Sequence, residues 1–144
     1  MRLQIVAKAI ILNSTGQVLL LKRSPTDPRR PGEWDFPGGE INPGEEITQG
    51  VCREILEETS LRADASKVKL VFAASQPYPE VSVTRLLFIA QIGNSDVKLS
   101  HEHDSFRWTT VSTVLELFPH PFYGSGLKYA LDHDLMLTNS KDAA

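Results

Sequence analysis

Residues 39–61 read GEINPGEEITQGVCREILEETSL, and their second half predicts the helix around which the rest of the fold is arranged. Between Ile47 and Thr59 there is neither a proline nor a strand-like alternation, and apolar side chains recur at helical spacing. On a helical wheel one face is apolar and the opposite face is acidic. The apolar face carries Val51, Cys52, Ile55 and Leu56, and the acidic face carries Glu54, Glu57 and Glu58.

The acidic face has two interpretations. The glutamates stand at positions i, i+3 and i+4, where like charges destabilise a helix mildly unless a cation lies between them. Oxygen ligands of this kind suit Mg²⁺ or Mn²⁺. In an isolated helix, a solvated surface with Arg53 and Glu57 as an i,i+4 ion pair is the simpler interpretation. The glycine-punctuated loop that precedes the helix, with Gly38, Gly39 and Gly44, can bring backbone groups close to a metal ion or a phosphate. An ordinary strand-to-helix connection is the alternative interpretation of this loop.

On both sides of this helix the sequence alternates between apolar runs and turn residues. The apolar runs predict strands at residues 3–12, 18–21, 34–37, 68–74, 81–92 and 106–109, and helical spacing predicts further helices at 111–117 and 125–131. A turn at 13–16 joins the first two strands as a hairpin, and residues 38–39 form another turn. We therefore expect an α/β (α+β) fold with a mixed β-sheet and helices on its faces. Residues 1–139 are expected to form one domain, and residues 140–144 a flexible tail.

Composition excludes several classes of protein. A formal charge of −3 and a pI near 5.8 give no electrostatic reason to hold a nucleic acid polymer. No apolar run approaches the length of a membrane span, and the N-terminal segment is interrupted by Gln4 and Lys8, unlike a signal peptide. The one cysteine, Cys52, lies in the apolar stripe of the helix and is interpreted as an inert core thiol. A reducing, cytoplasmic location fits these features.

The segment from residue 39 to residue 61 resembles the Nudix box, which has glycine, glutamate, arginine and paired glutamates at fixed spacing. The matching residues are Gly39, Glu45, Arg53, Glu54, Ile55, Glu57, Glu58 and Leu61. One position departs, because Ser60 stands where the family usually has glycine. Glycine is favoured there for its left-handed conformation after a helix, so Ser60 is expected to cost some local stability and to leave the carboxylates intact.

The resemblance implies an α/β/α sandwich and a Mg²⁺-dependent hydrolase, with Mn²⁺ as a substitute. It implies cleavage of the diphosphate linkage in a nucleoside triphosphate, an ADP-ribose-like molecule or a dinucleoside polyphosphate, by attack of water at phosphorus. Carried over by position, the metal ligands are Gly39, Glu54, Glu57 and Glu58, and the catalytic residues are Arg53, Glu54 and Glu57. The family often has a further glutamate ligand or base in a later loop, and Glu102 is the candidate for both roles. A plain surface-loop residue is the equally open alternative for Glu102. The alternative is a nucleotide-sensing module on the same fold that binds without cleaving.

Substrate-binding candidates lie outside the helix. They are Arg23, Arg29 and Arg30 in and before a proline-rich loop, Gly38 and Gly39, and Tyr78 in a proline-flanked bend. Ordinary solvated arginines and a packed aromatic ring are the simpler interpretation for each. His101 and His103 flank Glu102 and are interpreted as surface residues, because oxygen-rich Mg²⁺ sites seldom use imidazole. The expected partner is a small nucleotide-like molecule, bound by a monomer or a homodimer.

Overall fold

The computed structural model describes residues 1–93, 96–118 and 121–136. The predicted tail at residues 140–144 therefore lies outside the described residues. The elements, in chain order, are β1 (Arg2–Leu12), β2 (Val18–Arg23), β3 (Trp34–Asp35), β4 (Gly38–Glu40), α1 (Ile47–Thr59), a short 3₁₀ turn (Ala65–Lys67), β5 (Lys69–Pro77), β6 (Val81–Gln91), β7 (His103–Thr109), α2 (Val111–Leu117) and α3 (Pro121–Asp132).

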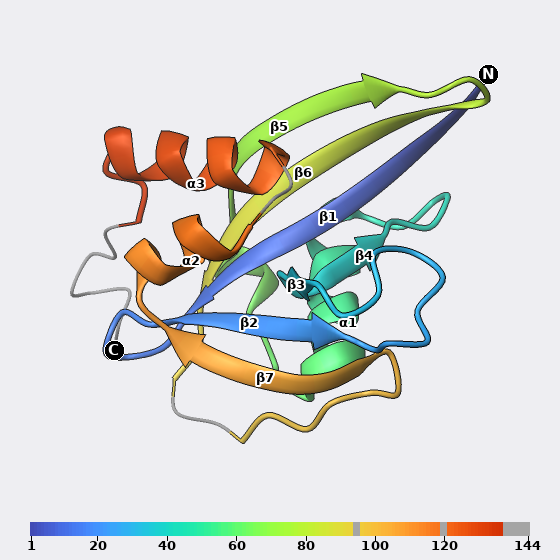
Figure 1. Cartoon of the computed structure of the whole chain (residues 1–144). Coiled ribbons are helices and arrows are strands. Elements are labelled where there is room, and N and C mark those ends of the chain that lie inside the picture. The colour runs from blue at the N-terminus through green and yellow to red at the C-terminus, as the bar shows by residue number, and fades with distance from the viewer. Residues whose placement is uncertain (94–95, 119–120, 137–144) are drawn as a thin grey trace.

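The strands form one mixed sheet. Its main path runs β3-β2-β1-β6-β5, with β4 also paired to β1 and β7 also paired to β2. The β1 and β6 pair is parallel and the other pairs are antiparallel. Helix α1 covers one face of the sheet, and α2 and α3 cover the other (Figure 1). The expected mixed sheet between helical layers is confirmed.

Strand β1 separates two apolar cores because its side chains alternate between the faces of the sheet. Ala7, Ala9 and Ile11 pack in the core beneath α1, and Ile10 and Leu12 pack in the core beneath α2 and α3. From residue 7 to residue 12 the strand is buried on both faces, which explains the nearly continuous apolar sequence there. The core beneath α1, which includes Val51 and Ile55, holds this helix against the sheet.

Helix α1 ends where the sequence predicts, and its caps explain why. The Glu46 side chain accepts hydrogen bonds from the backbone N–H groups of Thr48 and Gln49, which satisfies donors that the first turn leaves open. At the other end Ser60 adopts the left-handed conformation, with φ of 64°. The residue that replaces the usual glycine therefore takes the conformation that glycine favours. Its hydroxyl donates to the Lys98 carbonyl at 3.1 Å, which partly offsets the strain.

The predicted hairpin of the first two strands is present but short. Strands β1 and β2 pair antiparallel through Leu12 and Val18, and most of each strand pairs instead with β6 and β7, respectively.

Some local predictions were wrong. The predicted turn at residues 38–39 is the start of strand β4, which pairs with β1. On α1, Leu56 is 37% exposed rather than part of the core.

The ends of three other elements differ from the predicted ends. The last helix begins at Pro121 rather than residue 125, because proline fits the first turn of a helix. Strand β7 begins at His103 rather than residue 106, and β5 extends to Pro77.

Candidate active site

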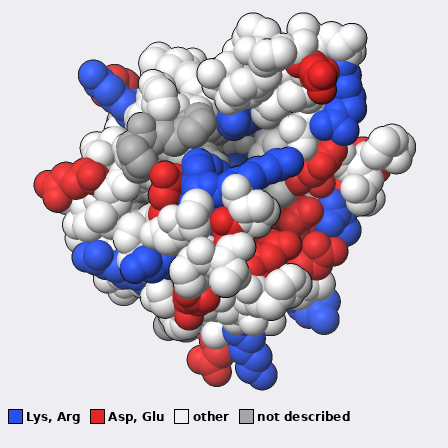
Figure 2. Space-filling model, turned by 45° about the vertical axis from the view of Figure 1, so that its right-hand side comes forward, with Lys and Arg blue, Asp and Glu red and all other residues white. Residues whose placement is uncertain are grey.

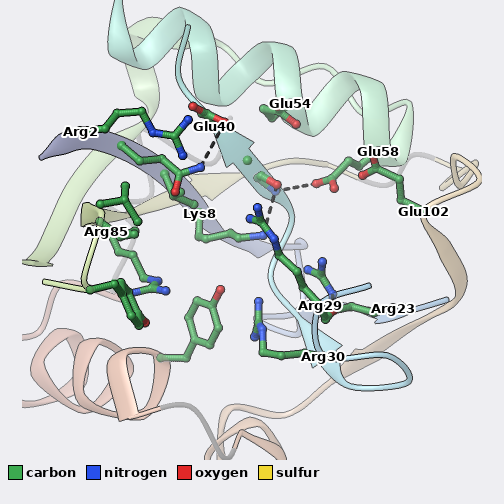
Figure 3. A pocket seen from close by; sticks show the side chains of 18 residues that line it. Arg2, Lys8, Arg23, Arg29, Arg30, Glu40, Glu54, Glu58, Arg85 and Glu102 are labelled. Carbon is green, nitrogen blue, oxygen red and sulfur yellow. Dashed lines mark hydrogen bonds between the residues drawn. The ribbon is translucent and has the colours of Figure 1, made fainter. Parts of the chain in front are cut away.

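A cavity of about 480 Å³ opens between α1, the strands β1 and β6 and the loop after β2. Figure 2 shows basic and acidic side chains gathered side by side around a hollow on one face of the molecule. The close view in Figure 3 separates them: glutamates come from the side of α1, and most arginines come from the opposite side. The acidic lining is Glu40, Glu54, Glu58 and Glu102, and the basic lining is Arg2, Lys8, Arg23, Arg29, Arg30 and Arg85.

Glu58 is the deepest acid of the cavity. Only 4% of it is exposed, and its Oε1 atom accepts a hydrogen bond of 2.7 Å from the Gly38 N–H. Burial raises the pKa of Glu58 to about 8, against the opposing attraction of the Lys8 ammonium. A cation beside this carboxylate would stabilise its ionised form. Burial also raises the pKa of Glu54, although Arg53 works in the other direction.

Arg53 holds three glutamates from outside the cavity. Its Nε donates to Glu45 Oε2 at 2.7 Å, and its Nη1 donates to Glu54 Oε1 at 3.0 Å and to both Glu57 oxygens at 3.2 Å. Its Nη2 donates to the Glu40 carbonyl at 3.1 Å, which ties the helix to β4. Planar guanidinium geometry allows this many directed bonds at once. Arg53 therefore orients Glu54 toward the cavity.

The sequence candidates divide into two groups. The described residues that line the cavity include the candidates Arg23, Arg29, Arg30, Gly38, Gly39, Glu54, Glu58, Tyr78 and Glu102. Arg53 and Glu57 stand outside that described lining, and the Glu57 side chain is 56% exposed. Only some of the glutamates on the acidic face of α1 therefore line the cavity. Glu58 points inward from the helix, whereas Glu57 stays in the solvent with Arg53.

Gly39 leaves room for the Glu54 carboxylate. A Cβ atom at Gly39 would lie 2.6 Å from the Glu54 carboxyl carbon, closer than real Cβ contacts allow. At Gly38, with φ of 140°, a Cβ atom would collide with the backbone of β1. The two glycines therefore permit β4 to run between β1 and the acidic helix.

The wall of the cavity opposite α1 carries basic side chains, which a buried aspartate holds in place. Asp35 is fully buried, and its Oδ2 atom lies 2.7 Å from Arg23 Nη1, 3.1 Å from Lys8 Nζ and 3.5 Å from Arg30 Nη2. Burial alone would raise the pKa of Asp35, but these cations outweigh it and lower the pKa to about 2. The Asp35 carboxylate thus holds the side chains of Lys8, Arg23 and Arg30 in place, and the wall keeps a net positive charge.

The far end of the cavity is formed by strands rather than helices. Arg2 and Gln4 of β1 and Arg85 of β6 line it, together with Tyr78 in the bend between β5 and β6. The Gln4 side chain donates to Glu40 Oε2 at 3.1 Å, and Tyr78 is 38% exposed. This region offers cationic and aromatic groups beyond the basic wall.

Sequence reasoning missed several lining and supporting residues. Lys8 and Asp35 had a visible signal: a lysine interrupts the apolar run at residues 3–12, and an aspartate lies between aromatic residues at 34–36. A charge inside a buried strand is costly unless it is paired. The sequence contains no such signal for Arg2 and Arg85, because lysine and arginine are common at exposed positions of strands.

His103 was predicted to be a surface residue, and this prediction was wrong. It is 6% exposed, with its Nδ1 atom 3.8 Å from Glu58 Oε2. Burial lowers the pKa of His103, which favours the neutral ring. The cause is strand β7, which begins earlier than predicted and carries this side chain inward.

The described carboxylates fit a hard divalent cation. Glu54 and Glu58 present oxygen atoms to one cavity, and Gly39 keeps the space beside Glu54 clear. Mg²⁺ and Mn²⁺ prefer oxygen ligands of this kind, completed by water and phosphate oxygens. Burial raises the pKa of Glu58, and the Lys8 ammonium offsets this effect only in part.

The fold and the cavity define an α+β sandwich in which an acidic helix faces a basic wall. The chain belongs to the NUDIX domain family, whose model matches residues 2–127. Within the described residues, no helix is long and apolar enough to cross a membrane.

The chain also resembles several individual proteins. An octanoyltransferase of Myxococcus xanthus is 35% identical to the chain over 106 residues, which is 72% of the chain's length. A putative 8-oxo-dGTP diphosphatase of Bacillus subtilis is 43% identical over 60 residues, which is 42% of the chain's length. The chain spans 29% and 37% of the lengths of these two relatives. The structure resembles the MutT protein of Methanosarcina mazei with a TM-score of 0.77 and 28% identity, over 92% of this chain and 96% of the other.

Proposed function

We propose that the protein is a Mg²⁺-dependent hydrolase that cleaves the diphosphate linkage of a nucleoside diphosphate-linked small molecule. One observation carries the proposal: Glu54 and Glu58 line the same cavity as Lys8, Arg23 and Arg30. An acidic wall that suits divalent metal and a basic wall that suits phosphate, facing each other, match a substrate that brings phosphate oxygens to a metal.

The carboxylates are proposed to hold the metal. Glu54, Glu58 and Glu102, with the Gly39 carbonyl, would supply oxygen ligands, and Glu57 would join through a side-chain rotation away from Arg53. A divalent metal in this position screens phosphate charge and lowers the pKa of bound water. Every ligand here is an oxygen atom, so Mn²⁺ would substitute for Mg²⁺.

The basic wall would hold the phosphates. Lys8, Arg23 and Arg30 are already fixed on Asp35, so binding an anion costs them little side-chain entropy. Arg29 lines the same wall and extends it toward the open end of the cavity. A diphosphate bound between this wall and α1 would have its phosphorus atoms within reach of the glutamates.

Proton transfer is assigned to Glu54. A general base works best when its pKa lies near the working pH, and burial raises the pKa of Glu54 in that direction. Arg53 would act through Glu54 by holding the carboxylate in one orientation. Glu102 is the second candidate for the base, because it lines the same cavity from the loop before β7.

The group beyond the diphosphate would lie at the strand end of the cavity, near Tyr78, Arg2 and Arg85. The name of the Bacillus subtilis relative supports nucleoside triphosphates as the first substrates to test. ADP-ribose-like molecules and dinucleoside polyphosphates are the other classes. We also propose that residues 1–139 form a single hydrolase domain, which acts in the cytoplasm as a monomer or homodimer and binds neither nucleic acid polymers nor membranes.

The direct test is to incubate the purified protein with these three substrate classes and Mg²⁺, with and without a chelator. We expect turnover of at least one class, its loss with the chelator, and its return with Mg²⁺ or Mn²⁺. Binding of a nucleotide without any cleavage across the panel would identify a sensing module and overturn the proposal. Glu54→Gln should lose turnover and keep nucleotide binding, and Glu102→Gln under the same conditions compares the second candidate base.

A further inference from the structure

Glu58, Glu102 and His103 form a cluster at the edge of the cavity. Each contributes one potential ligand atom, and these atoms all lie within 4.8 Å of one another. Glu58 comes from α1, Glu102 from the loop before β7, and His103 from the first position of β7. The cluster therefore joins elements that are distant in the sequence, and it adds a nitrogen donor to an otherwise acidic region.

Among the residues that the structure describes, the buried ring of His103 has no hydrogen-bond partner. The side chain is 3% exposed, and neither Nδ1 nor Nε2 has a hydrogen-bond partner among the described residues. Burying a polar group in this way is costly, and native proteins rarely leave such groups unsatisfied. A ligand that the imidazole binds would remove the cost.

The distance between His103 and Glu58 is too long for a hydrogen bond and suits a bridging ion. The Nδ1 atom lies 3.8 Å from Glu58 Oε2. Hydrogen bonds between nitrogen and oxygen are about 2.7–3.2 Å long. Two ligands at about 2.0–2.2 Å from one ion are separated by roughly 3–4.4 Å. The two atoms thus already have the spacing of two ligands on one metal ion. The other oxygen of Glu58, Oε1, accepts its hydrogen bond from the Gly38 N–H.

The loop that carries Glu102 is fastened to the end of α1. The N–H of Lys98 donates to the Thr59 carbonyl at 2.9 Å, and the N–H of Ser100 donates to the Glu58 carbonyl at 3.3 Å. On the other side, the Glu102 carbonyl accepts the Ser24 N–H at 3.0 Å. These bonds hold the cluster together before any ion arrives, which lowers the cost of binding.

We propose that Glu58, Glu102 and His103 form a mixed nitrogen and oxygen site for a borderline divalent transition metal of the Co²⁺ and Zn²⁺ class. Imidazole suits these ions far better than Mg²⁺, whereas two carboxylates satisfy their charge. The site is distinct from an all-carboxylate Mg²⁺ site because His103 is one of its ligands. It shares Glu58 and Glu102 with the proposed hydrolase, so a transition metal here competes with Mg²⁺ for both carboxylates.

Metal binding is measured without substrate, so its result is independent of hydrolysis. Metal-free protein is titrated with Co²⁺ by calorimetry and visible absorption, and separately with Mg²⁺. The parent should bind Co²⁺ at least tenfold more tightly than Mg²⁺. His103→Gln should weaken Co²⁺ binding at least tenfold and change its spectrum, and His101→Gln, an exposed neighbour, should leave both unchanged. Equal Co²⁺ affinity in the parent and His103→Gln would overturn the proposal.

A second measurement needs no variant. Pulsed electron paramagnetic resonance of the parent with one equivalent of bound Co²⁺ should detect coupling to an imidazole nitrogen. Its absence would overturn the assignment of His103 even if His103→Gln failed to fold. Turnover with Mg²⁺ is recorded in a separate assay of the parent. Nitrogen coupling without turnover would refute only the hydrolase, and turnover without nitrogen coupling would refute only this site.

Discussion

The Glu58 carboxylate accepts a 2.7 Å hydrogen bond from the backbone N–H of Gly38, and this bond joins α1 to β4 at the floor of the cavity. The carboxylate is buried, and the Lys8 ammonium is the positive charge that acts most strongly on its pKa. Glu58 is therefore part of the architecture, through Oε1, and part of the proposed chemistry, through Oε2.

Glu58→Gln should remove a pH dependence of stability. The pKa of Glu58 rises from 4.5 to about 8 on folding, so between these pH values the folded state binds more protons than the unfolded state. Stability of the metal-free parent should therefore fall as pH rises from 5 to 8. The charges that face Glu58 are Lys8, Asp35, Glu54 and the His103 ring when protonated.

Chemical denaturation of metal-free protein at pH 5, 6.5 and 8 measures the effect. Glutamine keeps the acceptor for the Gly38 N–H, so the variant should match the parent at pH 5 and exceed it by up to a few kcal/mol at pH 8. Glu57→Gln is the control, since that side chain is 56% exposed and should change stability little at any pH. A variant less stable than the parent at pH 8 would contradict the assigned pKa.

Gly39→Ala should lower turnover through a steric contact. The new Cβ would lie 2.6 Å from the Glu54 carboxyl group, so that carboxylate must move out of its position in the cavity. A displacement of about 1 Å in a catalytic group costs on the order of a hundredfold in rate. Steady-state kinetics with Mg²⁺ measure the loss. Gly124→Ala in α3 is the control, because a Cβ there meets open space, and it should keep full turnover.

Arg53→Lys should lower kcat much more than stability. Lysine retains the charge but cannot donate to Glu45, Glu54 and Glu57 at once. Arg53 is partly exposed, so the free energy of unfolding should fall by no more than about 1 kcal/mol. Kinetics and denaturation of the same preparations give both values. Exposed Arg62, just beyond the helix, supplies the matched Arg62→Lys control. An unchanged kcat in Arg53→Lys would refute its role in positioning Glu54.

Ile55→Ala should show the reverse pattern. Ile55 is fully buried in the core beneath α1, on the face opposite the glutamates. Its truncation leaves a cavity and costs about 2–5 kcal/mol of stability. The molecules that remain folded should keep much of their turnover, measured below the lowered melting temperature. A loss of turnover as large as that of Glu54→Gln would mean that the two faces of α1 are not separable.

Much of this organisation is visible in the sequence because it depends on local spacing. Glycine, arginine and glutamate positions along residues 39–61 predict the helix, its acidic face and the family. The bond between Arg53 and Glu57 is also local, because it joins positions i and i+4 of the helix. The burial of Glu58 is not local, because it depends on β4, whose Gly38 N–H reaches the Glu58 carboxylate.

Long-range contacts account for what the sequence does not predict. Lys8 and Asp35 are separated by 27 positions in the chain, and only the pairing of β1, β2 and β3 brings them together. His103 is buried because β7 extends along β2 as far as Arg23, beyond a register shift at the preceding residue. Apolar periodicity contains no information about such encounters between charged groups.

The central claim, metal-dependent hydrolysis of a diphosphate linkage, is tested most directly by isotope transfer. The parent protein is incubated with a nucleoside triphosphate, ADP-ribose and a dinucleoside polyphosphate in ¹⁸O-labelled water with Mg²⁺, and the products are analysed by mass spectrometry. We expect at least one substrate to be split between two phosphates, with a single ¹⁸O atom in one product, and we expect a chelator or Glu54→Gln to suppress the reaction. Binding of these molecules without label incorporation, or equal incorporation in the presence of the chelator, would refute metal-dependent hydrolysis.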